Sequence, residues 1–158
     1  MRKFFYGLGV VTAVLIVAAG IGFYFLASNG AALDTASKTY TEESVVAIAG
    51  NWDADQLWKR ASPRLRKAAT QQQISDLLAA AKDALGPMLE YRGSKGQALM
   101  SVVNAHSVVS AQYVASGSFQ KGAADFRINL VKQNETWMIE GFHIDSPAMM
   151  KRLVGVRS

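Results

Sequence analysis

The sequence has no cysteine among its 158 residues. The fold therefore contains no disulfide, no thiolate is available to bind zinc, and the cysteine-linked lipid anchor of bacterial lipoproteins is excluded. Histidine is nearly as scarce, because only His106 and His143 occur and they lie in different predicted elements. We expect no metal site, no cofactor, and a domain that is stabilised by its core alone.

Motifs for several kinds of chemistry are also missing. The sequence has no serine nucleophile elbow, no glycine-rich phosphate-binding loop and no EF-hand loop. It contains 17 basic and 12 acidic residues, and without Arg2 and Lys3 the remaining 15 basic residues make the domain only mildly basic. Aromatic side chains that could stack on bases are not interleaved with the basic residues at 59–67, and we expect no binding to nucleic acid.

Charge is absent from residues 4–26, which form one long hydrophobic run. A helix of this length reaches roughly 34 Å, enough to cross a hydrocarbon core of about 30 Å. Arg2 and Lys3 precede the run, whereas the first charges after it are Asp34 and Lys38. Because positive charge favours the cytoplasmic side, the sequence predicts a single-pass transmembrane helix with residues 1–3 in the cytoplasm and the rest of the chain outside.

Aromatic residues flank this run at both ends, at residues 4–6 and 23–25, which is typical of a retained membrane helix. A cleaved signal peptide has a shorter apolar region followed by small residues at the cleavage site. Residues 30–32, Gly-Ala-Ala, could serve as such a site, so cleavage is the alternative. Residues 27–34 are expected to form a linker, which keeps the following domain close to the membrane.

Helical signals fill the first half of that domain. Thr39 and Glu42 have the spacing of a capping box, and apolar residues at helical spacing predict a first helix over residues 35–49. An apolar stripe between residues 74 and 85 predicts a longer helix that ends at Gly86. Side chains suited to capping predict the starts of three later helices, and they are Asp53, Ser62 and Thr70.

After residue 87 the apolar pattern changes to alternation, which is typical of β-strands. Strands are predicted over residues 88–92, 98–103, 108–119, 123–132 and 137–145, with turns between them, although the sequence leaves open whether the chain is broken near Gly96. Helices followed by strands predict an α+β domain over residues 35–146, with helices on one face of an antiparallel sheet. Residues 147–158 are expected to form a short basic helix and tail.

The last strand requires an irregularity, because strict alternation would divide its large apolar residues between both faces of the sheet. One extra residue at Gly141 corrects the pattern. The residues that then face the helices are Trp137, Ile139, Phe142 and Ile144. The residues that then face away are Met138, Glu140, His143 and Asp145.

Four segments carry a resemblance to a known family: NWDAD at residues 51–55, LGP at 85–87, FQKG at 119–122 and WMIEGFHIDS at 137–146. Together the chain from Thr35 to Ser146 resembles the nuclear transport factor 2-like superfamily, a cystatin-like cone of helices wrapped by a curved antiparallel sheet. The closing segment is similar to that of bacterial exported domains, which implies a span in the bacterial inner membrane and a periplasmic domain. The superfamily includes isomerases, dehydratases, small-ligand binders and protein-interaction modules, so the resemblance implies a fold and no single reaction.

Enzymes with this fold use an Asp, Tyr or His inside the cone as acid or base. By that resemblance, the candidate catalytic residues are Asp145, His143 and Tyr113. The predicted bulge places Asp145 and His143 away from the packed face, which favours the alternative of a surface histidine beside an aspartate. An isomerase- or dehydratase-like enzyme is therefore the second reading of function.

Five positive charges fall within nine residues and predict an interaction patch, formed by Lys59, Arg60, Arg64, Arg66 and Lys67. Such a patch suits anionic headgroups or an acidic partner, and the alternative is the solvated side of two short helices. Met138, if it faces away from the helices, would belong to an apolar patch on the outer face of the sheet.

The first reading of function is a membrane-anchored, extracytoplasmic binding or assembly domain without catalytic activity. Its ligand would be a protein partner, a second copy of the chain, or a small apolar molecule in the mouth of the cone. One N-terminal span followed by such a cone is also similar to the layout of an assembly component of type IV secretion machines, which gives a third reading.

Overall fold

The computed structural model describes residues 30–103 and 106–155. The chain divides into two compact units, Met1–Leu33 and Asp34–Ser158, and the description below concerns the second. The predicted membrane span at residues 4–26 and the first residues of the predicted linker lie outside the described residues. Within the described ranges, no helix is both long enough and apolar enough to cross a membrane.

The N-terminal helix of the second unit covers residues 34–49, and helical backbone is already present at residue 30. The helix thus starts earlier than the predicted position, Thr35. The capping box predicted at Thr39 is wrong, because Thr39 lies inside the helix. A Thr and a Glu three residues apart share one helix face at any point of a helix, so their spacing alone does not mark a start.

Three further helices are α2 (Ala54–Arg60), α3 (Pro63–Ala68) and α4 (Gln71–Leu85). Each begins at a predicted capping residue. The side chains of Asp53 and Ser62 accept hydrogen bonds from backbone N–H groups in the first turns of α2 and α3. Thr70 and Gln73 form the predicted reciprocal capping box of α4. The helix ends at Gly86, whose φ of 74° is a left-handed conformation that suits glycine.

The sheet has four antiparallel strands in the order β1-β2-β3-β4. They are β1 (Met88–Val103), β2 (His106–Phe119), β3 (Gly122–Gln133) and β4 (Thr136–Asp145). The α+β class, with helices followed by an antiparallel sheet, is confirmed. The turn predicted between the strands 88–92 and 98–103 is wrong, because β1 continues through these residues as one strand, with a bulge between Tyr91 and Ser94. Gly93, with a φ of 96°, accommodates the irregularity.

The predicted bulge in β4 is confirmed. Asn129 pairs with Gly141 and Leu130 pairs with Ile139, so Glu140 is the extra residue. The alternation changes phase at this point, as the sequence pattern required. The buried residues of β4 include Trp137 and Ile139, and the exposed ones include His143.

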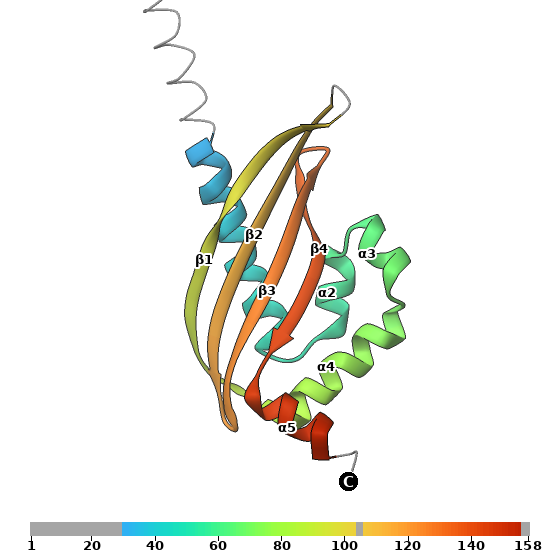
Figure 1. The fold of residues 1–158 in the computed structure, drawn as a ribbon, viewed down its shortest axis with the longest axis vertical. Coiled ribbons are helices and arrows are strands. Elements are labelled where there is room, and N and C mark those ends of the chain that lie inside the picture. Colours follow the sequence, from blue (N-terminus) through green and yellow to red (C-terminus); the bar gives the residue numbers. More distant parts are fainter. Residues whose placement is uncertain (1–29, 104–105, 156–158) are drawn as a thin grey trace, which may run out of the picture. The chain divides into compact units, whose positions relative to one another are not determined.

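The helices cover one face of the sheet and leave the other open (Figure 1). The N-terminal helix runs behind β1, β2 and β3, and α2 and α3 lie beside β4. The terminal helix α5 (Pro147–Gly155) packs against α4 and β3. A parallel bridge between Ala61 and Ile139 joins the helical half to β4, and the Ser62 N–H donates to the Ile139 carbonyl at 2.8 Å.

The hairpin of β1 and β2 extends past the rest of the sheet (Figure 1). β2 pairs with β3 only as far as Val109, which lies opposite Lys132. We call residues 99–103 of β1 with residues 106–110 of β2 the arm, and the remainder of the second unit the body. Met100 and Val102 in the arm are 57% and 74% exposed, although the same face of the sheet is buried in the body.

Candidate functional site

Aromatic rings fill the space between the helices and the sheet. The Trp52 ring lies 5.1 Å from Phe119 and 6.3 Å from Phe126, and Phe126 lies 5.8 Å from Phe142, measured between ring centroids. The Trp52 Nε1–H donates to the Gly86 carbonyl at 2.8 Å and so joins the loop before α2 to the end of α4. Three of the four rings are buried, and this part of the interior is a packed core.

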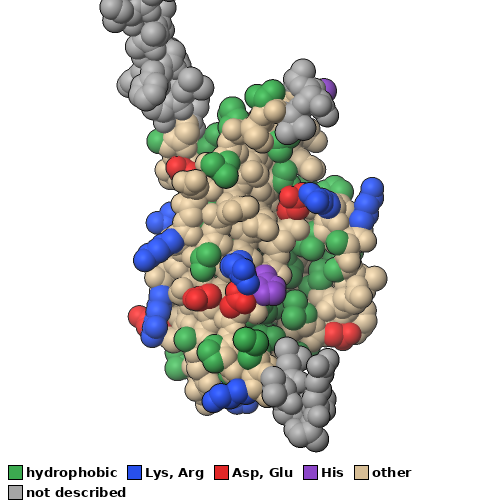
Figure 2. Space-filling view, in the orientation of Figure 1, with side chains coloured by type: hydrophobic (Ala, Val, Ile, Leu, Met, Phe, Trp, Pro, Cys, Tyr) green, Lys and Arg blue, Asp and Glu red, His purple; other side chains and the backbone are tan. Residues whose placement is uncertain are grey.

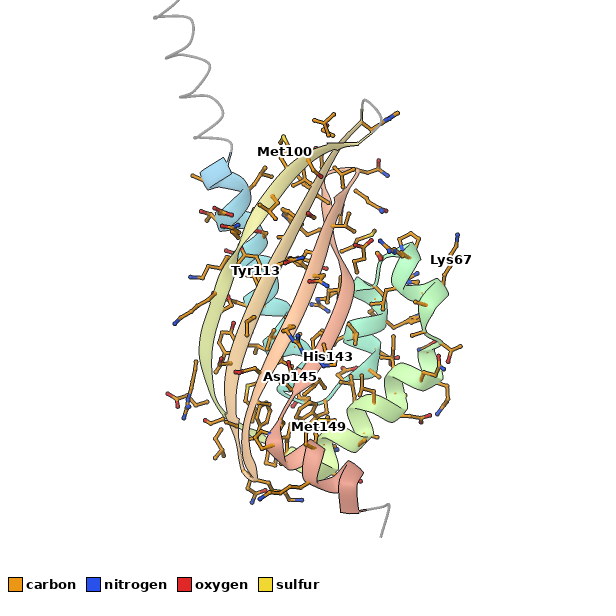
Figure 3. The ribbon with its side chains drawn as sticks, in the orientation of Figure 1. Lys67, Met100, Tyr113, His143, Asp145 and Met149 are labelled. Carbon is orange, nitrogen blue, oxygen red and sulfur yellow. The ribbon has the colours of Figure 1, made fainter. Side chains whose placement is uncertain are left out.

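Tyr113 is the predicted catalytic residue that faces the helices (Figure 3). Its hydroxyl lies 2.9 Å from Ser37 Oγ and donates to the Asp34 carbonyl at 3.1 Å. Burial raises the pKa of Tyr113, the hydrogen bond with Ser37 opposes this, and the carboxylates of Asp34 and Glu42 raise the pKa further. A tyrosine with a raised pKa stays protonated at neutral pH, so Tyr113 joins β2 to the N-terminal helix and is poorly suited to act as a base.

His143 and Asp145 lie on β4, and their side chains are 64% and 45% exposed (Figure 3). Arg127 donates to both carboxylate oxygens of Asp145, at 2.7 and 3.1 Å, and His143 Nε2 lies 3.2 Å from Asp145 Oδ1. The hydrogen bond from Arg127 lowers the pKa of Asp145, with a smaller contribution from His143. A lowered pKa makes a carboxylate a weaker base. The structure therefore brings His143 and Asp145 together, on the face opposite Tyr113.

Arg127 and Asp125 belong to the same cluster of charges. Asp125 on β3 pairs with Asp145 on β4, and Ser116 Oγ donates to Asp125 at 2.6 Å. Figure 2 shows acidic, basic and histidine side chains meeting on this face. The partners of Asp125 and Arg127 depend on the register of β3 with β4, which the sequence alone did not provide. Among the described residues, no three His, Asp or Glu side chains converge as metal ligands would.

The arginines of the predicted basic patch are engaged within the domain. Arg60 donates to the side chain and the carbonyl of Gln56. Arg64 lies 3.5 Å from Glu140. Arg66 lies over the Trp58 ring, 5.2 Å from its centroid, and donates to the Trp58 carbonyl at 2.9 Å. The contact of Arg66 with Trp58 joins α3 to α2, and the contact of Arg64 with Glu140 joins α3 to β4. All three arginines are thus less available to a ligand.

The two lysines of the patch, Lys59 and Lys67, are exposed and form no ion pair with a described residue. Figure 3 shows Lys67 extending away from α3. Met138, the remaining residue of the predicted interaction surface, pairs with Val131 and is half-buried. It is not among the large apolar side chains that the body exposes, whereas Val114 on the same face is 42% exposed.

An apolar groove of about 290 Å³ opens on the helical side of the body, between α2, α3, α4 and β4. Its walls include Leu57, Leu65, Ile74, Leu77 and Phe142. Leu77 was predicted to join the buried stripe of α4, but its side chain is 38% exposed at this groove. Concave apolar surfaces of this kind bind small apolar ligands or the apolar side chains of a protein.

A wider depression of about 570 Å³ lies beside the bulged part of β1. Its charged residues are of both signs, namely Lys38, Arg92 and Lys95 against Glu42 and Asp125. Ser94 Oγ donates to Glu42 at 3.3 Å, which joins this edge of the sheet to the N-terminal helix. The mixed charges favour neither an anion nor a cation as a ligand.

No protein-family model matches the chain, and no curated protein matches it. The class that the described residues define is an α+β domain in which helices precede a four-stranded antiparallel sheet.

Proposed function

We propose that this chain is a single-pass membrane protein whose extracytoplasmic domain acts by binding and not by catalysis. The observation that carries the proposal is the packed interior. The rings of Trp52, Phe119 and Phe126 occupy the space between helices and sheet, where a cone-shaped enzyme would hold its substrate. The uncharged residues 4–26, preceded by Arg2 and Lys3, support an anchor in a bacterial inner membrane with the domain on the periplasmic side.

We also assign the domain to the nuclear transport factor 2-like architecture. Helices on one face of a bent antiparallel sheet support this assignment, as do the bulges in β1 and β4, which increase the bend of a strand.

The isomerase- or dehydratase-like alternative lacks a supporting arrangement of side chains. Its candidate base Asp145 is held by Arg127 on the exposed face and has a lowered pKa. Tyr113 is buried but has a raised pKa. A role in assembling an envelope secretion machine would be one form of the binding function, and no described residue favours it over other forms.

The binding site in this proposal is the apolar groove between α2, α3, α4 and β4. Leu77 lies in it and is partly exposed, so it can be replaced without opening the core. Leu89 provides the matched control, because it is a leucine of β1 that is 68% exposed and does not line the groove.

The test is purification of the full-length protein in mild detergent, followed by native mass spectrometry of the chain and of everything bound to it in stoichiometric amount. We expect the wild-type chain to carry a protein, a second copy of itself or a small apolar molecule. Leu77→Glu should release that ligand, because a charge in an apolar groove costs desolvation free energy, whereas Leu89→Glu should retain it.

Two results would count against the proposal. A wild-type chain that carries nothing under these conditions would contradict the binding function. Equal loss of the ligand from Leu77→Glu and Leu89→Glu would exclude the groove as its site. Tryptophan fluorescence reports whether each variant is folded, because all 3 tryptophans of the sequence lie in the domain.

A further inference from the structure

The arm has an unusual surface for an exposed hairpin, since it has apolar side chains on both faces. Met100 and Val102 lie on the face that is covered by helices in the body, and they are 57% and 74% exposed. Leu99 and Val108 lie on the opposite face and are 47% and 37% exposed. A partner docked on one face would leave the other in water. Apolar residues on both faces suit surroundings that enclose the end of the hairpin.

Charge is absent from the arm and from the residues of β1 and β2 that adjoin it. Residues 96–120 contain no Lys, Arg, Asp or Glu. Exposed edges of sheets normally carry charged residues, which oppose unwanted association. In β1 such charges occur only in the body, at Glu90, Arg92 and Lys95, and none follows Lys95.

The free edge of β1 limits how deeply the arm can enter an apolar phase. The Ala98 N–H donates to Asp34 Oδ1 at 2.5 Å, so the edge is capped at the base of the arm. Beyond Ala98, β1 has β2 on one side and no strand on the other. Backbone groups without partners are costly in hydrocarbon but are readily hydrated among lipid headgroups. The arm is therefore suited to the membrane interface and unsuited to crossing the bilayer.

The N-terminal helix points in the same direction as the arm. Its residue Glu42 contacts Ser94 of β1, and its residue Asp34 contacts Ala98. The start of this helix therefore lies beside the part of β1 that is nearest the arm. Asp34, the first residue of the second unit, therefore lies at the end of that unit that carries the arm. Figure 1 shows this end of the helix beside β1, and Figure 3 marks Met100 beyond it.

The distances are compatible with a common membrane surface. Residues 27–33 connect the predicted span to Asp34, and because residues 30–33 are helical the segment covers no more than about 16 Å. From Ala98 to Val103 the arm covers about 17 Å at the rise of a β-strand. The tip of the arm can therefore reach the bilayer in which the chain is anchored.

We propose that the arm inserts its apolar side chains into the interface of that bilayer and gives the domain a second membrane contact beside its anchor. This inference rests on the membrane anchor of the proposed function. In this arrangement, lipid molecules contact the exposed apolar side chains of the arm. Pairing of two copies along β1 is the competing arrangement, and the experiment below distinguishes it.

The experiment uses the full-length protein in lipid vesicles, and the absence of native cysteine allows a fluorophore to be placed at a single site. The label is attached at Val102→Cys in the arm or at Ala123→Cys, an exposed control at the opposite end of the sheet. Each sample is exposed to lipids that carry a quencher near the headgroup and, separately, to iodide in the aqueous phase. Flotation of the vesicles after an alkaline wash reports whether the chain is anchored.

We expect strong quenching by the lipid at residue 102 and strong quenching by iodide at residue 123. Adding Met100→Glu to the Val102→Cys protein should lower the inserted fraction by about tenfold, the effect expected from removing one apolar contact with lipid. The label at residue 102 should then become accessible to iodide.

Three results would overturn the inference. Equal quenching of both labels by iodide would show that the arm stays in water. A label at residue 102 that is shielded from iodide but not quenched by the lipid would show that protein, such as a second copy, covers the arm. In both cases flotation would leave the anchor supported. Failure of the chain to float would reject the anchor itself, together with the inference that rests on it.

Discussion

The strands β1 and β2 run through both the body and the arm, yet the two regions differ in what covers these strands. In the body, the inner positions Ala111, Tyr113 and Ala115 of β2 are buried beneath helices. In the arm, the inner positions Met100 and Val102 of β1 are exposed. Alternation along a strand thus indicates which residues share a face but not whether anything covers that face. The strands β1 and β2 therefore contribute to the core in the body and form an exposed apolar surface in the arm.

The largest expected effect on stability comes from truncating one side chain in each region. Phe126→Ala should lower the free energy of unfolding by about 3–5 kcal/mol, because it leaves a cavity among Trp52, Phe119 and Phe142. Val102→Ala should change it by less than about 0.5 kcal/mol, because that side chain is mostly exposed. Urea unfolding of the full chain in detergent micelles, followed by tryptophan fluorescence, measures both. Similar losses in the two variants would mean that the arm is covered in solution.

A smaller effect is expected at Gly96, just before the arm begins. A Cβ at this position would collide with the Gln112 carbonyl and the Tyr113 Cα, which are backbone atoms and cannot move aside easily. Gly96→Ala should therefore force β1 away from β2 and cost about 1–3 kcal/mol in the same unfolding experiment. Gln97→Ala, at the exposed next residue, is the control and should be close to neutral. An unchanged midpoint for Gly96→Ala would show that the two strands are less closely paired than described.

The hydrogen bond from Ala98 to Asp34 joins the base of the arm to the N-terminal helix. Asp34→Ala removes the acceptor and should cost about 1 kcal/mol, or about fivefold in the protection of the Ala98 amide against hydrogen exchange. Asp34→Asn keeps a side-chain oxygen and should have a smaller effect. The Asp34 carbonyl, which accepts from Tyr113, is retained in both variants. Unchanged exchange at Ala98 in Asp34→Ala would argue that this cap does not form in solution.

The smallest effect is expected on the open face of the body, at Arg127 and Asp145. Arg127→Gln should raise the pKa of Asp145 toward its ordinary value, and His143→Gln should raise it less, because Arg127 is the main cause of the lowering. Carbon-13 NMR of the Asp145 carboxyl group measures both. An equal or larger shift in His143→Gln would contradict the assignment of Arg127 as the main partner.

The contribution of the contact between Arg127 and Asp145 to folding stability depends on pH in a defined direction. A carboxylate whose pKa is lowered by folding stabilises the folded state above its unfolded pKa of about 3.9 and loses that contribution as the pH falls through the folded value. The difference in stability between wild type and Arg127→Gln should therefore vanish in acid. It should be small even at neutral pH, because both side chains are well exposed.

Local chemistry made part of this fold predictable. The capping residues Asp53, Ser62 and Thr70 act within one helical turn, so their sequence context was sufficient to locate three helix starts. The bulge in β4 was predictable because strict alternation would have exposed large apolar side chains. The turn predicted after residue 92 was wrong for a local reason. Gly93 has a positive φ, which occurs in turns and in bulges alike, and only the pairing of β1 with β2 distinguishes the two.

The surfaces were less predictable than the elements, because they depend on contacts between residues distant in the sequence. The pattern placed His143 and Asp145 on the open face, but not beside Arg127, which depends on strand register. The charge cluster near residue 60 was visible, but not that Glu140 and Trp58 engage two of its arginines. The exposure of the arm could not be predicted, because it depends on where the covering helices end.

The bridge between Ala61 and Ile139 has a consequence for the order in which the domain folds. Each strand of the sheet pairs with its neighbour in the chain, so the hairpins can form as soon as their residues have been synthesised. The backbone N–H of Ser62, in contrast, can donate to the Ile139 carbonyl only after β4 has been made. Closing so long a loop costs entropy that is recovered only when the last strand docks. The helical half is therefore joined to β4 only after the last strand of the sheet has been made.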